Sequence, residues 1–356
     1  MGTNIFAFVV VVGVLVFFHE LGHFLVARLF GVGVEKFSLG FGPRIFGKKI
    51  GITDYRISAI PLGGYVKMVG EEPDASVEPD KLPLSFTHKH VLKRIMIVAA
   101  GPFFNVLLAV LIFYGIFQFS GLMILKPVVG TVQEGNPAQK AGLQSGDQIT
   151  AIDGVPLESW DEMAEIIGGS RGEALQITVQ RDGDRRVFNI RPEVRKTQNL
   201  FGEEVSRFVI GITPSGDFET RALNPIQAIS ESFVQTYKVI ELTVVSVAKI
   251  IQGTISSKNI GGPIMIAEMA GQQAKQGALN LLFFIALISI NLAILNILPI
   301  PVLDGGHLLF FFIELIIGRP VSIRVREVAQ QAGLFVLILL MIFVFYNDIT
   351  RLIFDQ

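Results

Sequence analysis

Four long apolar stretches constrain the fold of this 356-residue chain more than any other feature. A helix that crosses a bilayer needs roughly 20 mostly apolar residues. Three of the stretches reach that length, and the fourth reaches it only when its polar flanks, out to 329 and 353, are counted. They run over residues 5–30, 92–119, 279–302 and 333–346. The sequence therefore predicts a multi-span α-helical membrane protein with about four transmembrane helices.

The composition supports the membrane class and argues against a nucleic-acid partner. Charged residues make up 17% of the chain, whereas soluble domains carry about 25%. The formal net charge of -1 provides no long-range field that would attract nucleic acid. We therefore expect the lipid bilayer, and no nucleic acid, as a partner. The chain has no cysteine, so any metal ion must be held by nitrogen and oxygen ligands.

The basic residues predict the orientation of the spans. Lysine and arginine are concentrated in residues 31–94 and after the third apolar stretch, whereas residues 1–4 carry neither. By the positive-inside rule these basic segments are cytosolic, so the N-terminus and residues 120–278 lie outside. The first stretch also lacks the basic start and cleavage site of a signal peptide, and we expect it to be retained. A shorter apolar piece, 308–317, is predicted to be interfacial or re-entrant.

Residues 126–215 are predicted to form a small α/β domain between the second and third spans. Expected helices start at Pro137 and Ser159, and expected strands cover 128–132, 149–152, 175–179, 187–190 and 208–212. The run from Asn136 to Gly154 resembles bacterial PDZ domains. That resemblance implies that Phe208 to Ile212 receives the end of a peptide by strand addition. A spacer without ligand is the alternative.

An amphipathic helix is predicted after this domain. Over 224–253, apolar residues recur at helical spacing with charged residues between them. Such a helix could lie on the membrane or on the inserted domain, or form part of that domain's core.

Three ionisable residues interrupt the first apolar stretch: His19, Glu20 and His23. Ionisable groups at bilayer depth are costly and usually functional. Residues four apart lie on one face of a helix, so the two histidines can bind one metal ion while Glu20 projects beside it. Neutral imidazoles suit zinc, and an adjacent carboxylate can act as a general base. The pattern predicts a Zn²⁺ cofactor, His19 and His23 as ligands, and Glu20 as the catalytic residue.

A catalytic zinc ion needs a third protein ligand. Asp304 and His307 follow an apolar run that two prolines interrupt. Asp304 could be a ligand or the cap of a following helix, and His307 is a competing ligand. Spacing alone leaves both residues open.

The chain resembles the site-2 protease family of intramembrane zinc metalloproteases over nearly its whole length, most closely the bacterial RseP-type (regulator of sigma-E protease) branch. The resemblance rests on His19-Glu20-Leu21-Gly22-His23, on the motif from Asn296 to Gly305, and on the PDZ-like domain between the spans. Weaker signatures lie at 37–43, 61–66 and 101–105. Many proteins of this branch have two PDZ domains, whereas this chain has room for one.

The resemblance implies roles for further residues. It makes Asp304 the third zinc ligand and Asn296 a residue that holds the substrate backbone, with Asn291 a weaker candidate. An interhelical hydrogen bond is the alternative for both asparagines. The resemblance also implies a re-entrant β-hairpin within 36–68, on the cytosolic side near the zinc ion, and a bacterial inner-membrane location.

The expected domains are 1–119 with two spans, 126–215 as the PDZ domain, 216–278 as a helical connector, and 279–356 with the last two spans. The expected function is zinc-dependent intramembrane proteolysis of a single-span membrane protein, such as an anti-sigma factor or a signal-peptide remnant, with a possible peptide tail at the PDZ domain. A non-catalytic scaffold with a closed four-ligand metal site and a metal-ion transporter are the alternatives.

Overall fold

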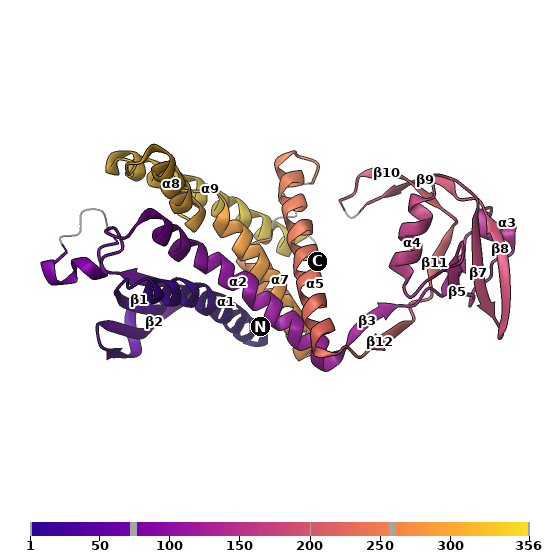
Figure 1. The fold of residues 1–356 in the computed structure, drawn as a ribbon, viewed down its shortest axis with the longest axis horizontal. Coiled ribbons are helices and arrows are strands. Elements are labelled where there is room, and N and C mark those ends of the chain that lie inside the picture. The colour runs from indigo at the N-terminus through magenta and orange to yellow at the C-terminus, as the bar shows by residue number, and fades with distance from the viewer. Residues whose placement is uncertain (1, 72–76, 200, 256–260, 355–356) are drawn as a thin grey trace. The chain divides into compact units, whose positions relative to one another are not determined.

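The computed structural model describes residues 2–71, 77–199, 201–255 and 261–354 (Figure 1). These residues divide into two compact units. A helical unit comprises Met1–Tyr114, Ile229–Ala248 and Ser256–Gln356, and a second unit comprises Gly115–Ala228 and Lys249–Ile255. The second unit contains the domain that is inserted between the second and third long apolar helices, and we call it the inserted domain.

Four helices of the described chain are long and apolar enough to cross a membrane, as predicted: α1 (Gly2–Leu29), α2 (Val91–Ser120), α7 (Ala278–Ile297) and α9 (Ile323–Phe354). At 1.5 Å per residue, even the 20 residues of α7 extend about 30 Å, the thickness of the hydrocarbon core. The structure is that of a multi-span membrane protein.

Three further α-helices lie wholly or partly in the described part of the helical unit: α5 (Pro225–Ile251), α6 (Pro263–Gln276) and α8 (Asp304–Ile317). The predicted amphipathic helix corresponds to α5. Its middle, Ile229–Ala248, belongs to the helical unit, and no α5 residue belongs to the described core of the inserted domain. The alternative in which this helix forms part of that core is therefore wrong. Residues 256–260 of the predicted connector lie outside the described residues.

Helix α6 was not predicted from the sequence. Its N-terminus is capped by a carboxylate that is distant in sequence. Asp348 of α9 accepts hydrogen bonds from the amides of Gly262 at 2.9 Å and Ile264 at 3.0 Å. The first amides of a helix have no partner within the helix, and an acidic group there also interacts favourably with the helix dipole. Because the carboxylate comes from more than 80 residues away along the sequence, local pattern could not reveal this helix end.

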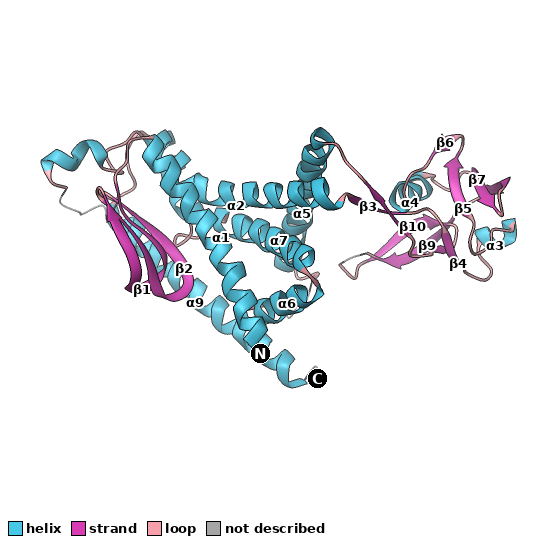
Figure 2. Cartoon of the chain, turned by 90° about the horizontal axis from the view of Figure 1, so that it is seen from below, coloured by secondary structure: helices cyan, strands magenta, loops and turns pink. Residues whose placement is uncertain are grey.

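Residues 34–68 form the expected hairpin, built from β1 (Val34–Ile50) and β2 (Thr53–Met68). The start of β1 lies between the two ends of β2, so that Phe37 pairs with Val66 on one side and with Tyr55 on the other. Residues 64–68 therefore form one edge of a curled sheet, with strand partners on one side only among the described residues. Figure 2 shows the hairpin beside α1, and β2 contacts that helix. A short 3₁₀ helix, Pro79–Leu84, follows.

The inserted domain is a small β-rich domain with two short helices, α3 (Pro137–Ala141) and α4 (Trp160–Gly169). The Ser159 side chain caps α4 by accepting a hydrogen bond from the Glu162 amide at 3.1 Å. The central sheet has the strand order β6-β5-β7-β8, and β11-β4, β10-β9 and β12-β3 form two-stranded pairs. The strands are β3 (Leu122–Leu125), β4 (Val129–Val132), β5 (Gln148–Ile152), β6 (Val155–Pro156), β7 (Leu175–Arg181), β8 (Asp184–Ile190), β9 (Glu193–Gln198), β10 (Glu204–Val209), β11 (Ile212–Pro214) and β12 (Phe218–Arg221).

One strand prediction in this domain is wrong. The expected strand 208–212 is divided between β10 and β11, which have different partner strands. Gly211 lies between them with a φ of 84°, a left-handed conformation that residues other than glycine rarely adopt. The place that a Cβ would take at Gly211 is filled by Asn136. The chain therefore turns at this glycine instead of continuing as a strand.

A buried ion pair stabilises the inserted domain. The Asp147 side chain is fully buried and accepts hydrogen bonds from Arg181 Nε at 2.6 Å and Nη2 at 2.7 Å. Asp147→Asn is expected to lower the free energy of unfolding of this domain by about 3 kcal/mol, because it leaves a poorly exposed arginine without its carboxylate. Trp160 is the only tryptophan of the chain, so its fluorescence during unfolding of the full-length protein reports on this domain.

The same pair predicts a pH dependence. Burial alone would raise the pKa of Asp147, but the hydrogen bonds from Arg181 and from the Gln144 amide outweigh it and hold the pKa below its usual value. The stabilisation is therefore complete above the unfolded-state pKa of about 3.9 and is lost as the pH falls through the lower folded-state pKa. Asp147→Asn should flatten this acid transition, whereas Asp184→Asn at the exposed start of β8 should retain it. An unchanged acid transition in Asp147→Asn would contradict the assignment.

Candidate metal centre

Helix α1 places three polar side chains together inside an apolar span. His19 and His23, one turn apart, bring their Nε2 atoms to 3.2 Å from each other. His23 Nδ1 lies 2.9 Å from the carbonyl oxygen of Ile97 in α2. A carbonyl can only accept a hydrogen bond, so Nδ1 carries the proton and the Nε2 lone pair faces the site. Glu20 is also buried, with 9% of its surface exposed.

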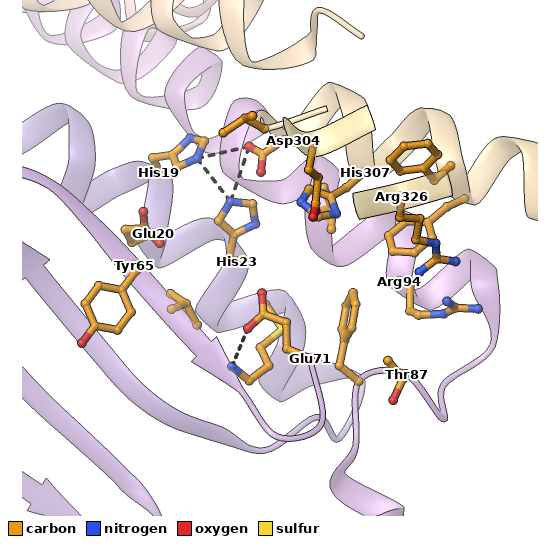
Figure 3. A pocket seen from close by; sticks show the side chains of 18 of the residues that line it. His19, Glu20, His23, Tyr65, Glu71, Thr87, Arg94, Asp304, His307 and Arg326 are labelled. Carbon is orange, nitrogen blue, oxygen red and sulfur yellow. Dashed lines mark hydrogen bonds and ion pairs between the residues drawn. The ribbon is translucent and has the colours of Figure 1, made fainter. Parts of the chain in front are cut away.

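The loop after α7 delivers Asp304 to these histidines. Asp304 is the first residue of α8, and the backbone of Leu303 occupies the cap position, so the aspartate side chain remains available as a ligand. Its Oδ2 lies 3.2 Å from His19 Nε2 and 3.6 Å from His23 Nε2 (Figure 3). A Cβ at Gly305 or Gly306 would collide with backbone of the loop 297–301. Only glycines therefore allow the loop to fold tightly over the start of α8.

The three side chains fit a zinc ion. Their ligand atoms lie within 4.8 Å of one another, and a tetrahedral ion with bonds of about 2.0–2.1 Å separates its ligands by about 3.3 Å. The observed separations of 3.2, 3.2 and 3.6 Å bracket that value. The buried Oδ2 of Asp304 accepts no hydrogen bond from the described residues. Imidazole nitrogens and a carboxylate oxygen that converge in a buried place without hydrogen-bond donors are best satisfied by a bound cation.

The cluster of His19, His23 and Asp304 opens into a cavity of about 600 Å³. Glu20 lines it, together with Gly64, Tyr65 and Val66 of the β2 edge. His307 also lines the cavity but is not among the three described residues that converge as metal ligands. Of the two candidates that spacing left open, Asp304 is the one whose carboxylate oxygen converges with the two imidazoles. Figure 3 shows the labelled side chains around this cavity.

Two glycines let α1 and α2 approach closely at the cluster. A Cβ at Gly101 would lie 2.6 Å from His23 Cε1 and 2.7 Å from His19 Cε1. On the facing helix, a Cβ at Gly22 would lie 2.8 Å from the Ala100 carbonyl carbon. All three distances are shorter than real Cβ contacts. The sequence showed Gly101 only within a weak family signature, and its contact with both imidazoles depends on the crossing of the helices.

A charged group at the far end of the cavity connects three helices. Arg94 of α2 lies 2.5 Å from Glu314 of α8, and Arg326 of α9 lies 3.7 Å from the same carboxylate. Arg94 and Arg326 line the cavity. Glu314 lies within the apolar piece 308–317, and the sequence assigns it no partner. Its arginine partners are 220 residues and 12 residues away along the chain, so no local pattern pairs them.

The two candidate substrate-binding asparagines lie outside the described lining of this cavity. Asn291 Oδ1 accepts a hydrogen bond of 2.9 Å from Thr243 of α5, which is the interhelical bond considered as its alternative role. Asn296 is partly exposed in the last turn of α7. A role in substrate binding stays a prediction for both residues.

Known proteins are similar in sequence to this protein along almost the whole chain. The profile of peptidase family M50 matches residues 7–340. A protein from Mesorhizobium japonicum, provisionally named a zinc metalloprotease, is 37% identical, over 96% of this chain and 97% of its own. A protein from Campylobacter jejuni with the same provisional name is 38% identical, over 98% of this chain and 93% of its own.

The fold and the site define a multi-pass membrane protein with a site for a catalytic metal ion. The chain belongs to peptidase family M50, the site-2 protease family, and it is a zinc metalloprotease.

Proposed function

We propose that this protein is an intramembrane endopeptidase that cleaves the transmembrane segment of a single-span membrane protein, with His19, His23 and Asp304 as zinc ligands. The position of the cluster carries this proposal. His19 and His23 belong to α1, whose 28 residues are apolar enough to span a membrane. A scissile peptide bond must therefore reach the zinc ion at this depth, where substrates are themselves membrane segments.

Glu20 is the proposed general base. When bound, the zinc ion supplies the Lewis acidity that makes water nucleophilic near neutral pH and stabilises charge on the scissile carbonyl. Glu20 lines the same cavity as the three ligands and can accept a proton from the attacking water. It can then deliver that proton to the leaving amine, as general acid–base catalysis requires.

The edge of the β1–β2 sheet is the proposed binding place for an extended substrate segment. Peptide bonds of a transmembrane helix are shielded by the helix, so the segment must become extended before cleavage. Residues 64–68 form an edge with partners on one side only among the described strands, and Gly64 to Val66 line the cavity beside Glu20. We propose that an unwound substrate segment pairs with this edge. Asn296 and Asn291 would hold its backbone further along.

The proposed location is the bacterial inner membrane, with the hairpin and the zinc site toward the cytosol. The excess of basic residues in 31–94 supports this orientation. The distal part of the hairpin carries exposed apolar side chains, including Ile45 at 71% and Phe46 at 73% exposed. Such a surface suits a re-entrant hairpin in contact with lipid.

The inserted domain is proposed to be an extracytoplasmic PDZ domain. A cavity of about 440 Å³ lies against α4 and residues 207–212, and it is lined by Trp160, Met163 and Ile167 among others. It would receive a peptide tail, or the domain would exclude substrates that still carry a large outer domain. Anti-sigma factors trimmed outside the membrane and signal-peptide remnants are the proposed substrates.

Reconstitution tests the proposal. The purified full-length protein and a single-span substrate without an outer domain are placed in liposomes, and products are mapped by mass spectrometry. We expect a cut within the transmembrane segment that is lost on zinc chelation and restored by zinc. A matched substrate with an all-leucine segment, which resists unwinding, should be cleaved more slowly. Cleavage confined to residues outside the membrane segment would contradict the proposal.

A further inference from the structure

Asn105 of α2 lies beside His19, one of the three clustered side chains, and is fully buried. Its amide nitrogen is placed 3.3 Å from Nδ1 of His19, the ring nitrogen that faces away from Asp304. The amide oxygen, also buried, has no hydrogen-bond partner among the described residues. The sequence showed Asn105 only as the last residue of a weak family signature, without a role.

Zinc binding determines which hydrogen bond this pair can make. If His19 binds the ion through Nε2, its Nδ1 carries the proton and becomes a donor. An amide nitrogen cannot accept that hydrogen bond, but an amide oxygen can. The two ends of an asparagine amide have nearly the same shape, so the hydrogen bonds must decide its orientation. With its oxygen toward His19, Asn105 satisfies two buried groups that otherwise lack a partner.

We propose that Asn105 is a positioning residue that accepts the Nδ1–H of His19 through its amide oxygen, and so sets the tautomer and ring orientation of this zinc ligand. His23 is held in the same way by the carbonyl of Ile97, 2.9 Å from its Nδ1. Both imidazoles of α1 are therefore held by acceptors from α2. Partners of this kind commonly change metal affinity 10–100-fold when they are removed.

The backbone of Asn105 supports the same role. Its carbonyl oxygen accepts a hydrogen bond of 2.7 Å from the hydroxyl of Ser289 in α7, and Ser289 is fully buried. Helix α7 leads into the loop that carries Asp304. Asn105 is thus bonded to α7 through its backbone and lies against His19 of α1 through its side chain.

Zinc affinity of the purified full-length protein, measured by competition with a chelating dye, tests the proposal. Asn105→Leu keeps the size of the side chain but removes the acceptor, and we expect it to weaken zinc binding by about 10–100-fold. Asn105→Asp keeps an acceptor and adds charge, and it should bind zinc at least as tightly as the wild type. Gly115→Ala, on the same helix but with no atom within 4 Å of the place that its Cβ would take, should stay close to the wild type.

A purely structural role for Asn105 gives a different result. A new buried charge would then damage the protein at least as much as leucine, so equal losses in Asn105→Asp and Asn105→Leu would overturn the proposal. Wild-type affinity in Asn105→Leu would also overturn it.

The proposal rests on the ligand set of the proposed function, and His19→Ala separates the two. Unchanged zinc affinity in His19→Ala would refute that ligand set itself. Loss of zinc in His19→Ala together with wild-type affinity in Asn105→Leu would refute only the role of Asn105.

A measurement on the cobalt-substituted wild type does not depend on the folding of any variant. Paramagnetic proton NMR should show two shifted imidazole N–H signals that exchange slowly with water, because both protons are bonded to buried acceptors. Rapid exchange of the His19 signal would overturn the proposal.

Discussion

Replacing Glu20 by glutamine is expected to reduce the rate of substrate cleavage by about 10²–10⁴-fold, the usual contribution of a general acid–base group. Glutamine has nearly the same size as glutamate but cannot accept a proton from water. Because Glu20 is not one of the three converging ligands, zinc content should remain that of the wild type. Cleavage of a single-span substrate in liposomes and metal analysis of the same sample measure the two quantities.

The matched control is Glu327→Gln. Glu327 also lines the cavity, but it is exposed and lies on α9, so its loss should leave most of the activity. Full activity in Glu20→Gln with zinc still bound would show that another group accepts the proton. An equal loss in both variants would indicate a general dependence on cavity charge.

Gly101→Ala is expected to abolish both zinc binding and activity, although it adds only one methyl group. The new Cβ would lie within 2.7 Å of carbon atoms in both imidazole rings. These rings cannot withdraw without leaving the metal position, and the backbone of a packed helix cannot shift freely. Overpacking of this kind costs about 1–3 kcal/mol in stability, and here the strain acts directly on two of the proposed ligands.

Gly115→Ala on the same helix is the matched control. No atom lies within 4 Å of the place that its Cβ would take, and alanine favours helix over glycine, so zinc affinity and activity should not fall. The purified variants are compared by zinc titration and by thermal unfolding with chelator present. If Gly101→Ala bound zinc as tightly as the wild type, the close crossing of α1 and α2 would not be required for the site.

Much of the fold could be predicted because it depends on local pattern. Apolar length indicated α1, α2, α7 and α9, since the bilayer requires about 20 apolar residues from any spanning helix. Alternation and turn residues indicated β4, β5, β7 and β8 of the inserted domain. The pattern failed at Gly211 and at α6, where Asn136 and Asp348 act from distant parts of the chain.

For the site, the sequence by itself determined the pair His19 and His23 and the adjacent Glu20, because helical geometry alone places residues four apart on one face. Only the tertiary structure brings the Asp304 carboxylate, and not His307, against the two imidazoles, since that placement depends on how the loop folds over Gly305 and Gly306. It also brought Gly101 and Asn105 to the imidazoles and Arg94 to Glu314. These contacts join helices that are far apart in sequence, and their distances follow from packing, which no local spacing encodes.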